Sequence, residues 1–323
     1  MLKQLKIENF RCFESFELNH LGRVNLLVGK NNCGKTSILE ALKIFFSDDT
    51  FKSLKQIIVS HGEYIQNTDK FDISYLFNRH ELRFDKQIVI FGTFKDDNQA
   101  RIKLSVIEIR NEKKLKYFLN YSLMLDIETK NIALRNKLVN SSSLTTQESL
   151  ELFNQVVLTP EEDLVYQALQ IIEPNIERIA PIGNEIKNNN SRSGFFVRLK
   201  DTQKRVPIGS MGDGIWRMLG LSLALVSAKD GVLLVDEIDT GLHYTALEDM
   251  WKLIWETSKK LNVQVFATTH SSDCWKALEA LTSREDVGEE DISIQRIEKD
   301  APRSVAYNKE EIATAVEREI EVR

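Results

Sequence analysis

The fold is decided by a stretch near the N-terminus, Val24-Asn25-Leu26-Leu27-Val28-Gly29-Lys30-Asn31-Asn32-Cys33-Gly34-Lys35-Thr36. A mostly apolar run of strand length ends at Gly29, and a pattern with helical spacing begins near Lys35. Between them the residues fit G-x-x-x-x-G-K-[ST]. Consecutive backbone N–H groups of such a loop surround a phosphate, and the positive end of the following helix adds to the attraction. The stretch therefore predicts an α/β fold with a phosphate-binding loop.

Each residue type in this loop has a predicted task. Gly29 and Gly34 allow the backbone to approach a phosphate closely, Lys35 reaches the β- and γ-phosphates, and the Thr36 hydroxyl ligates Mg²⁺. The alternative is a chance match without a nucleotide, which the strand–loop–helix context disfavours. The predicted nucleotide-binding loop is completed by Lys30, Asn31, Asn32, Cys33 and Ser37.

Two later apolar strands also end in residues that bear chemistry. Val232–Val235 is followed by Asp236 and Glu237. Asp236 is predicted to hold Mg²⁺ through water, and Glu237 to polarise an attacking water; the alternative is a merely polar strand end. Val263–Thr268 is followed by His270, which is predicted to donate a hydrogen bond to a γ-phosphate rather than to be an ordinary loop histidine.

A second glycine-rich segment, Pro207–Gly214, precedes a predicted helix over Trp216–Ala228. Ser210, Gly212 and Gly214 suit a phosphate at a helix N-terminus. The simpler interpretation is a helix start without a ligand. If both loops bind phosphate, one triphosphate cannot easily accept both from the same chain.

The rest of the chain divides into segments by hydrophobic pattern. We predict a single domain over 1–323, with an antiparallel β segment at 71–135, a helical insertion at 136–195, and a lobe at 196–300 with the second loop, the acidic strand and the histidine. Residues 47–70 are not assigned. Along the chain, the predicted strands are Phe71–Phe77, Ile88–Phe94, Ala100–Ile109, further strand in 116–135, Phe195–Leu199 and Ile292–Ile297. The predicted helices are Gln147–Val157, Pro160–Ile172, Thr245–Leu261, Cys274–Leu281 and Lys309–Glu319.

The composition disfavours two classes, disordered chains and proteins that bind nucleic acid over their whole surface. Hydrophobic residues make up 42% and charged residues 28% of the 323 residues, as in an ordinary globular protein. The formal charge of -5 argues against nucleic-acid binding by the whole surface. Two local basic runs remain as candidates, although a solvated face is the simpler interpretation of each: Lys113, Lys114 and Lys116, and Lys200, Lys204 and Arg205.

Cysteine usage and hydropathy bear on the compartment. The three cysteines, Cys12, Cys33 and Cys274, are far apart, which excludes a disulfide framework and a CxxC metal site and suits a reducing environment. No apolar run reaches the roughly 18 residues that span a bilayer, and the start has no apolar signal region. We therefore expect a cytoplasmic chain that does not enter a membrane.

In their order along the chain and in their residues, these motifs resemble those of ABC-type ATPases, and more closely those of the RecF, SMC and OLD branch. Lys6–Phe13 resembles the I-x-N-F-R-x-F start of that branch, Ser210–Gly214 its S-x-G-D-G signature in OLD-like proteins, Asp236–His243 its DEIDTGLH run, and Thr268–Ser271 its TTHS run. The resemblance implies an ABC-type P-loop ATPase head that binds ATP and Mg²⁺ as a homodimer or larger homo-oligomer. It also implies that the signature loop with Asp213 caps the ATP of the other subunit, and that Asp239 lies at the seam.

The chain departs from the pattern in three respects. The usual Q-loop glutamine is not evident, and Asn78 and His80 lie in roughly that region. The long coiled coil of SMC-like proteins is missing. Only residues 271–323 follow His270, so the Toprim nuclease domain of OLD proteins is not evident, and the acids at 289–291 do not reproduce its metal-binding pattern.

Three functions remain open from sequence. The leading hypothesis is an OLD-like ATPase switch that controls a separate nuclease or toxin effector, a combination that the resemblance associates with anti-phage defence. The second is a RecF-like clamp that binds DNA directly, which would show a steep salt dependence. The third is a scaffold that binds ATP without turnover, against which Glu237 argues, because such a scaffold needs no water-polarising acid.

Overall fold

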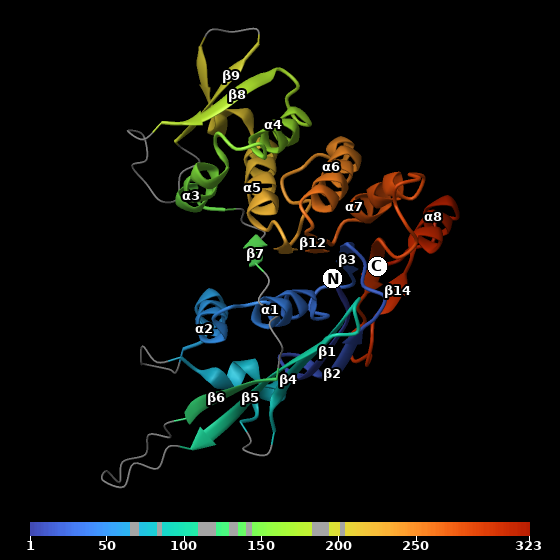
Figure 1. The fold of residues 1–323 in the computed structure, drawn as a ribbon. Helices are drawn as coiled ribbons and strands as arrows, with labels where there is room; N and C mark the ends of the chain where they lie inside the picture. Colours follow the sequence, from blue (N-terminus) through green and yellow to red (C-terminus); the bar gives the residue numbers. More distant parts are fainter. Residues whose placement is uncertain are drawn as a thin grey trace.

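The computed structural model describes residues 1–64, 71–82, 86–108, 121–128, 135–139, 144–182, 194–200 and 204–323. The basic run at 113–116 and the polar loop at 184–193 lie outside these ranges. Figure 1 shows a central sheet with helices on both faces, an antiparallel sheet on one side and a small three-stranded sheet on the other. None of the described helices is both long and apolar enough to cross a lipid bilayer.

The central sheet has six strands in the order β14-β13-β3-β12-β11-β7. β3 pairs in parallel with both β12 and β13, and β11 pairs in parallel with both β12 and β7. Only β14 runs antiparallel among these pairings. The bounds are β3 Val24–Val28, β7 Arg135–Val139, β11 Gly231–Val235, β12 Gln264–Thr268, β13 Ile292–Arg296 and β14 Val305–Tyr307.

The inner strands are apolar because both faces of the sheet are covered. Along β3, the side chains of Val24, Leu26 and Val28 join one core, whereas Leu27 joins the other. The first core holds the helices of the C-terminal half, and the second holds α1. The helices are α1 Lys35–Phe45, α3 Thr146–Val156, α4 Glu162–Gln170, α5 Asp213–Ser227, α6 Leu247–Lys260, α7 Ser272–Ala277 and α8 Lys309–Glu317.

The antiparallel sheet packs on the other side of α1, in the order β2-β1-β4-β5-β6. Its strands are β1 Leu2–Phe10, β2 Phe13–Leu18, β4 Ile88–Phe94, β5 Gln99–Glu108 and β6 Tyr121–Glu128. The strand predicted at Phe71–Phe77 was wrong. The structure has the 3-10 turns η1 Ile73–Leu76 and η2 Asn78–His80 there, because the Asp72 carboxylate accepts from the Ser74 N–H and hydroxyl, which favours a turn.

One helix, α2 Thr50–His61, lies in the stretch that the sequence pattern left unassigned. Its ends carry recognisable signals. The Asp49 side chain accepts from the Lys52 N–H at the start, and Gly62 adopts a left-handed conformation with φ of 66° at the end. The apolar side chains between these ends, Leu54, Ile57 and Ile58, are buried against the α1 core.

The insertion predicted as helical at 136–195 contains strands as well as α3 and α4. β7 occupies its start, and β8 Ile176–Pro181 pairs with β9 Phe195–Leu199 and β10 Arg205–Pro207 in the order β10-β9-β8. The register of β8 shifts between Ile176 and Arg178, so the buried Ile176 and Ile179 are three residues apart. The helices predicted here, Gln147–Val157 and Pro160–Ile172, correspond to α3 and α4, whereas β8 lacks the alternating pattern of a strand because of this register shift. The outer boundaries 1–323 stay a prediction.

A fully buried asparagine ties the entrance of β3 to its neighbours. The Asn25 Oδ1 accepts from the Gly22 N–H at 2.7 Å and from the Ser293 hydroxyl at 3.0 Å. Its Nδ2 donates to the carbonyls of Gly22 and Val265. All four hydrogen bonds of its amide are therefore made, two to Gly22 just before β3 and one each to the neighbouring strands β12 and β13.

We predict that Asn25→Ala lowers the free energy of unfolding by about 3 kcal/mol, because the variant leaves buried polar groups without partners. Urea unfolding measures the loss. Asn98→Ala, at an exposed turn, is the control and should change stability by less than about 0.5 kcal/mol. An Asn25 variant as stable as the control would show that the network contributes little.

Candidate functional site

Three neighbouring strands of the central sheet deliver the predicted site residues to one edge. β3, β12 and β11 are consecutive and parallel, so their carboxyl ends lie side by side. The phosphate loop follows β3, His270 follows β12, and Asp236 and Glu237 follow β11. In open α/β sheets this edge is where ligands bind.

The loop after β3 needs both of its glycines. Gly29 has φ of 143° and Gly34 has φ of 105°, values that residues with a side chain rarely adopt. A Cβ on Gly29 would lie 2.4 Å from the Ile297 carbonyl oxygen, and one on Gly34 would lie 2.3 Å from the Phe13 ring. α1 begins directly at Lys35, so its first N–H groups have no acceptor within the helix. The geometry fits a phosphate-binding loop.

The side chain of Lys35 is buried over this loop, with 5% of the residue exposed. Its Nζ donates to the carbonyls of Gly29 at 2.7 Å and Lys30 at 3.0 Å, and lies 3.4 Å from the His270 Nδ1. Burial lowers the pKa of the Lys35 amine, an effect that the nearby Cys33, Asp236 and Glu237 oppose. A cation is thus held where phosphate charge would arrive.

Two threonines at the end of β12 fix the acidic residues of the neighbouring strand. The Thr268 hydroxyl donates to Asp236 Oδ1 at 2.6 Å and accepts from the Glu237 N–H at 2.8 Å. The Thr269 hydroxyl donates to Asp239 Oδ1 at 2.6 Å. The sequence places both threonines in the TTHS run before His270 but indicates no role for them, because their partners follow a strand about 30 residues earlier in the chain.

The oxygen atoms of Thr36 and Asp236 come together as an Mg²⁺ site would require. Thr36 Oγ1 lies 3.5 Å from Asp236 Oδ2. Magnesium is commonly held by one or two protein oxygens together with substrate phosphates and water, so a closed cage of carboxylates is unnecessary. Among the described residues, no group of three or more His, Cys, Asp or Glu forms such a cage.

Glu237 has an unusual backbone conformation, which a side chain of α5 supports. Its φ is 47°, in the left-handed region, and the Arg217 Nη2 donates to the carbonyls of Asp236 at 3.0 Å and Glu237 at 2.7 Å. The Glu237 carboxylate accepts from the Thr240 hydroxyl and lies 4.0 Å from the His270 Nε2. Strained backbone of this kind often marks functional sites.

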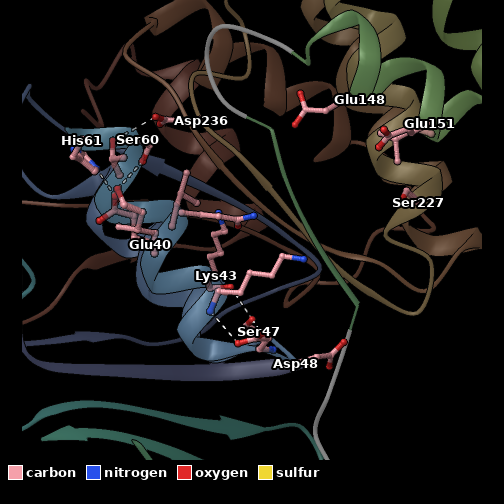
Figure 2. Close-up of a pocket in the computed structure, with 18 of the residues that line it drawn as sticks. Glu40, Lys43, Ser47, Asp48, Ser60, His61, Glu148, Glu151, Ser227 and Asp236 are labelled. Atoms are coloured by element: carbon pink, nitrogen blue, oxygen red, sulfur yellow. Dashed lines mark hydrogen bonds and ion pairs between the residues drawn. The ribbon is translucent and has the colours of Figure 1, made fainter. Parts of the chain in front are cut away.

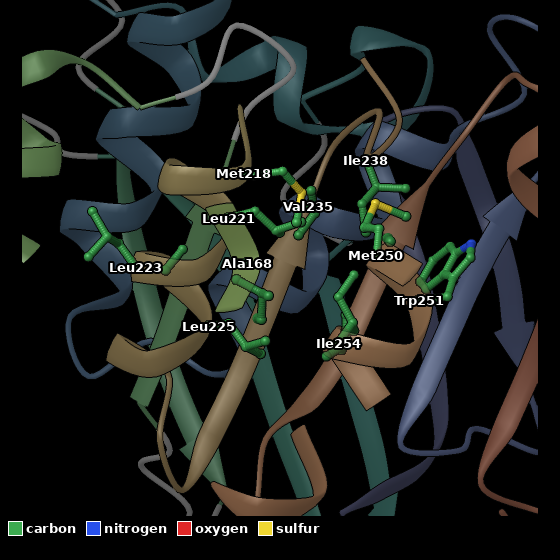
Figure 3. Close-up of a cluster of buried hydrophobic side chains, with 14 of the residues drawn as sticks. Ala168, Met218, Leu221, Leu223, Leu225, Val235, Ile238, Met250, Trp251 and Ile254 are labelled. Atoms are coloured by element: carbon green, nitrogen blue, oxygen red, sulfur yellow. The ribbon is translucent and has the colours of Figure 1, made fainter. Parts of the chain in front are cut away.

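Arg217 is nearly fully buried on α5, which is anchored by the core around Met218, Leu221 and Val235 (Figure 3). Burial lowers the pKa of its guanidinium, whereas the three carboxylates of Asp239, Asp236 and Glu237 raise it. We had not predicted this residue. The signal was a single arginine within an otherwise apolar helix.

The second glycine-rich loop is exposed and does not fold over the first. The Ser210 hydroxyl donates to the Pro207 carbonyl at 2.7 Å. Gly212, with φ of 95°, precedes the first residue of α5, the exposed Asp213. A Cβ on Gly241 would lie 3.5 Å from the Asp213 Cβ, so the loop lies beside the segment that follows Asp239.

Two cavities border the phosphate loop. One of about 1090 Å³ reaches Thr36 and Asp236 and continues between α1, α2 and α3 (Figure 2). The other, of about 940 Å³, is lined by Asn32, Gly34 and Ser37 on one side and by residues of β1–β2 and the 3-10 turns on the other. The Q-loop candidates Asn78 and His80 line this second cavity, and Asn78 Nδ2 donates to the Arg11 carbonyl.

Comparison with known proteins agrees with this geometry. A family model described as "AAA domain, putative AbiEii toxin, Type IV TA system" matches residues 24–273. The chain belongs to this family. This AAA-domain chain is 22% identical to an "ATP/GTP phosphatase" of Helicobacter pylori, over 88% of its own length and 90% of the relative's. It is 24% identical to the "DNA replication and repair protein RecF" of Rickettsia prowazekii, over 83% of its own length and 74% of the relative's.

Other similarities place the AAA-domain chain within a branch. An "OLD nuclease" of Thermus scotoductus is 46% identical over 48 residues, which is 15% of this chain and 9% of the nuclease. An SMC head solved with the C-terminal winged-helix domain of ScpA has a TM-score of 0.59 at 14% identity, covering 95% of this chain and 97% of that one. The chain is therefore an ABC-type P-loop ATPase of the RecF, SMC and OLD branch with an α/β fold, which confirms the resemblance in the sequence.

We predict that Lys35→Ala abolishes ATP binding or turnover and leaves the fold intact, because the only lysine that hydrogen-bonds carbonyls of the phosphate loop among the described residues is removed. Binding of a fluorescent ATP analogue and phosphate release measure the effect, with circular dichroism to check folding. Lys260→Ala, an exposed lysine at the end of α6, is the matched control. Normal hydrolysis by a folded Lys35→Ala protein would refute the assignment of the loop.

Proposed function

We propose that this protein is an ATP-hydrolysing switch in which two copies enclose two ATP molecules. The observation that carries the proposal is the position of Glu237. Its backbone is fixed by Arg217 and Thr268, and its carboxylate lies beside His270, which itself lies beside Lys35. A carboxylate fixed next to a phosphate loop suits a residue that orients water for phosphoryl transfer.

Each residue of the cluster has a task in this proposal. The loop from Gly29 to Ser37 binds the phosphates through backbone N–H groups, and Lys35 neutralises their charge. Bound Mg²⁺, held by Thr36 and by Asp236 through water, would supply further neutralisation of phosphate charge. Glu237 orients the attacking water. His270 donates a hydrogen bond to the γ-phosphate oxygens.

The second loop completes the site of the partner copy in this proposal. Ser210, Gly212 and Asp213 are exposed, and Asp213 lies beside Gly241. The Ser210 hydroxyl contacts the Pro207 carbonyl and takes no part in the contacts that fix Lys35. A phosphate-suited helix start with an exposed loop therefore fits the ATP of a second subunit better than that of its own. Asp239 and the segment after it would lie at the seam between the two copies.

The output of the switch is proposed to be control of a separate effector protein, a nuclease or a toxin, in anti-phage defence. This part rests on the resemblance of the Ser210–Gly214, Asp236–His243 and Thr268–Ser271 motifs to those of OLD-like proteins. The alternative is a clamp that binds DNA directly, which the 24% identity to a RecF protein over most of the chain favours. A steep fall of duplex affinity with salt would support the clamp.

We predict that Glu237→Gln binds ATP, hydrolyses it about 10² to 10⁴ times more slowly and accumulates as a dimer. The amide keeps the size of the side chain but orients water poorly, so the ATP-bound form persists. Turnover and light scattering with ATP are measured together. The control is Glu310→Gln, an exposed glutamate on α8. Turnover within a few-fold of wild type would mean that another residue orients the water.

A mixture of two inactive variants tests whether the site is shared. Lys35→Ala and Ser210→Arg should each be inactive, whereas their mixture should regain some ATP turnover. In a mixed dimer one site carries both defects and the other carries neither. Subunit exchange is verified independently with labelled proteins. Full activity of Ser210→Arg alone would show that this loop does not contact ATP.

A further inference from the structure

The three-stranded sheet β10-β9-β8 lies at one end of the molecule, over α4 and α5 (Figure 1). One face is apolar and buried: Phe195 and Val197 of β9 and Ile179 of β8 belong to the main core. Because side chains alternate along a strand, the residues between them point to the opposite face. None of the site residues described above lies on that face.

The outward face carries three arginines in register. Arg198 of β9 pairs with Arg178 of β8 on one side and with Arg205 of β10 on the other. Residues directly opposite in antiparallel strands project to the same side, so the three form a row, here called the arginine row, about 10 Å long at the backbone. All three are exposed, and Lys200 and Lys204, also exposed, lie next to it in sequence.

This arrangement is unfavourable without an anion. Like charges directly opposite in a sheet are destabilising. In the described part of the chain, Glu177 pairs with Arg198 at 2.9 Å, and Arg178 lies beside the Tyr166 hydroxyl, which donates to Glu162. These contacts hold the Arg198 guanidinium beside Glu177 and turn that of Arg178 toward α4. The charges described here still leave a positive excess, because Arg205, Lys200 and Lys204 add to the two arginines against Glu162 and Glu177. The excess is local, since the whole chain carries -5.

An aromatic side chain lies beside the row on the same face. Phe196 is two residues before Arg198 and is partly exposed, with Ala180 and Pro207 as its cross-strand partners. Neither cross-strand partner carries an aromatic or a charged side chain, so the partly exposed Phe196 is the one aromatic residue in these two pairings. Proteins that bind single-stranded nucleic acids on a sheet combine two kinds of side chain. Cationic side chains contact the phosphates, and an aromatic side chain next to them stacks on a base.

We propose that the outward face of β8–β9–β10 binds a single-stranded nucleic acid, with the arginine row contacting consecutive phosphates and Phe196 stacking on an unpaired base. An acidic protein segment would satisfy the charges but would make no use of the ring. Duplex DNA would likewise contact the arginines but would keep its bases away from Phe196. The ring therefore favours the single strand.

The test measures binding of a fluorescein-labelled oligothymidine of about 16 nucleotides to the full chain by anisotropy, between about 50 and 200 mM salt. The wild type should bind. The double variant Arg198→Ala/Arg205→Ala should lose at least about tenfold in affinity at the lower salt. The slope of log K against log salt should fall by about 1.4, because each phosphate contact contributes about 0.7. Arg318→Ala, an exposed arginine at the end of α8, is the control and should bind as wild type.

Phe196→Leu separates stacking from charge. This variant keeps an apolar side chain and should lose about five- to a hundredfold in affinity with an unchanged salt slope. Thermal unfolding of the arginine variant without oligonucleotide should be no lower than wild type, because repulsion is removed. If the double variant nevertheless fails to fold, Arg205→Gln alone replaces it and should lower the slope by about 0.7.

Three results would overturn the proposal. The first is no binding of the oligonucleotide, or equal binding by the double variant and the Arg318 control. The second is binding of polyglutamate but not of the oligonucleotide, which would assign the face to an acidic protein. The third is tighter binding of duplex than of single strand with no effect of Phe196→Leu. None of these measurements requires ATP, so they are independent of the proposed switch.

Discussion

The parallel pairing of β3 between β12 and β13 is the constraint on which the site depends. Leu26 of β3 is paired with Ala267 on one side and with Ile294 on the other. That register places the phosphate loop next to the end of β12, and β12 in turn aligns with β11. A slip of one residue would turn the Leu27 side chain from one core to the other and displace the loop from the threonines. The packing of both cores therefore fixes the position of the phosphate loop relative to Thr268 and Thr269.

Three carboxylates and two cations determine the charge of the group of polar atoms at the ends of these strands. Asp236, Glu237 and Asp239 lie within four residues, and Arg217 is buried among them while Lys35 faces them from the phosphate loop. The Arg217 guanidinium is the most deeply buried charge of this group, and the partly exposed carboxylates offset it while the Asp236 and Glu237 carbonyls accept its hydrogen bonds. Arg217 therefore has a structural reason to be present apart from any role in turnover. Because Arg217 belongs to α5, its hydrogen bonds also connect the end of β11 to the helix that starts at the second loop.

The sequence predicted those features that depend on local pattern. The phosphate loop, the acidic strand end and the histidine were found because a strand, a loop and a helix are adjacent in the chain. Thr268 and Arg217 were not assigned, since their contacts join residues that are 32 and 20 positions apart. The strand predicted at Phe71–Phe77 was wrong because the Asp72 side chain favours a turn. β8 was not predicted, because a register shift removes the alternation of its buried residues. The roles of the individual site residues stay predictions.

The place of β3 in the sheet also bears on how the chain is assembled during synthesis. Both of its neighbours come from the last quarter of the sequence, residues 264–268 and 292–296. Until they emerge from the ribosome, β3 has two unpaired edges and α1 lacks its contacts with β12. Contacts of such large sequence separation form late and slowly. The antiparallel strands β1, β2, β4 and β5 have partners within residues 2–108, whereas β3 waits for its partners through most of translation with apolar surface exposed.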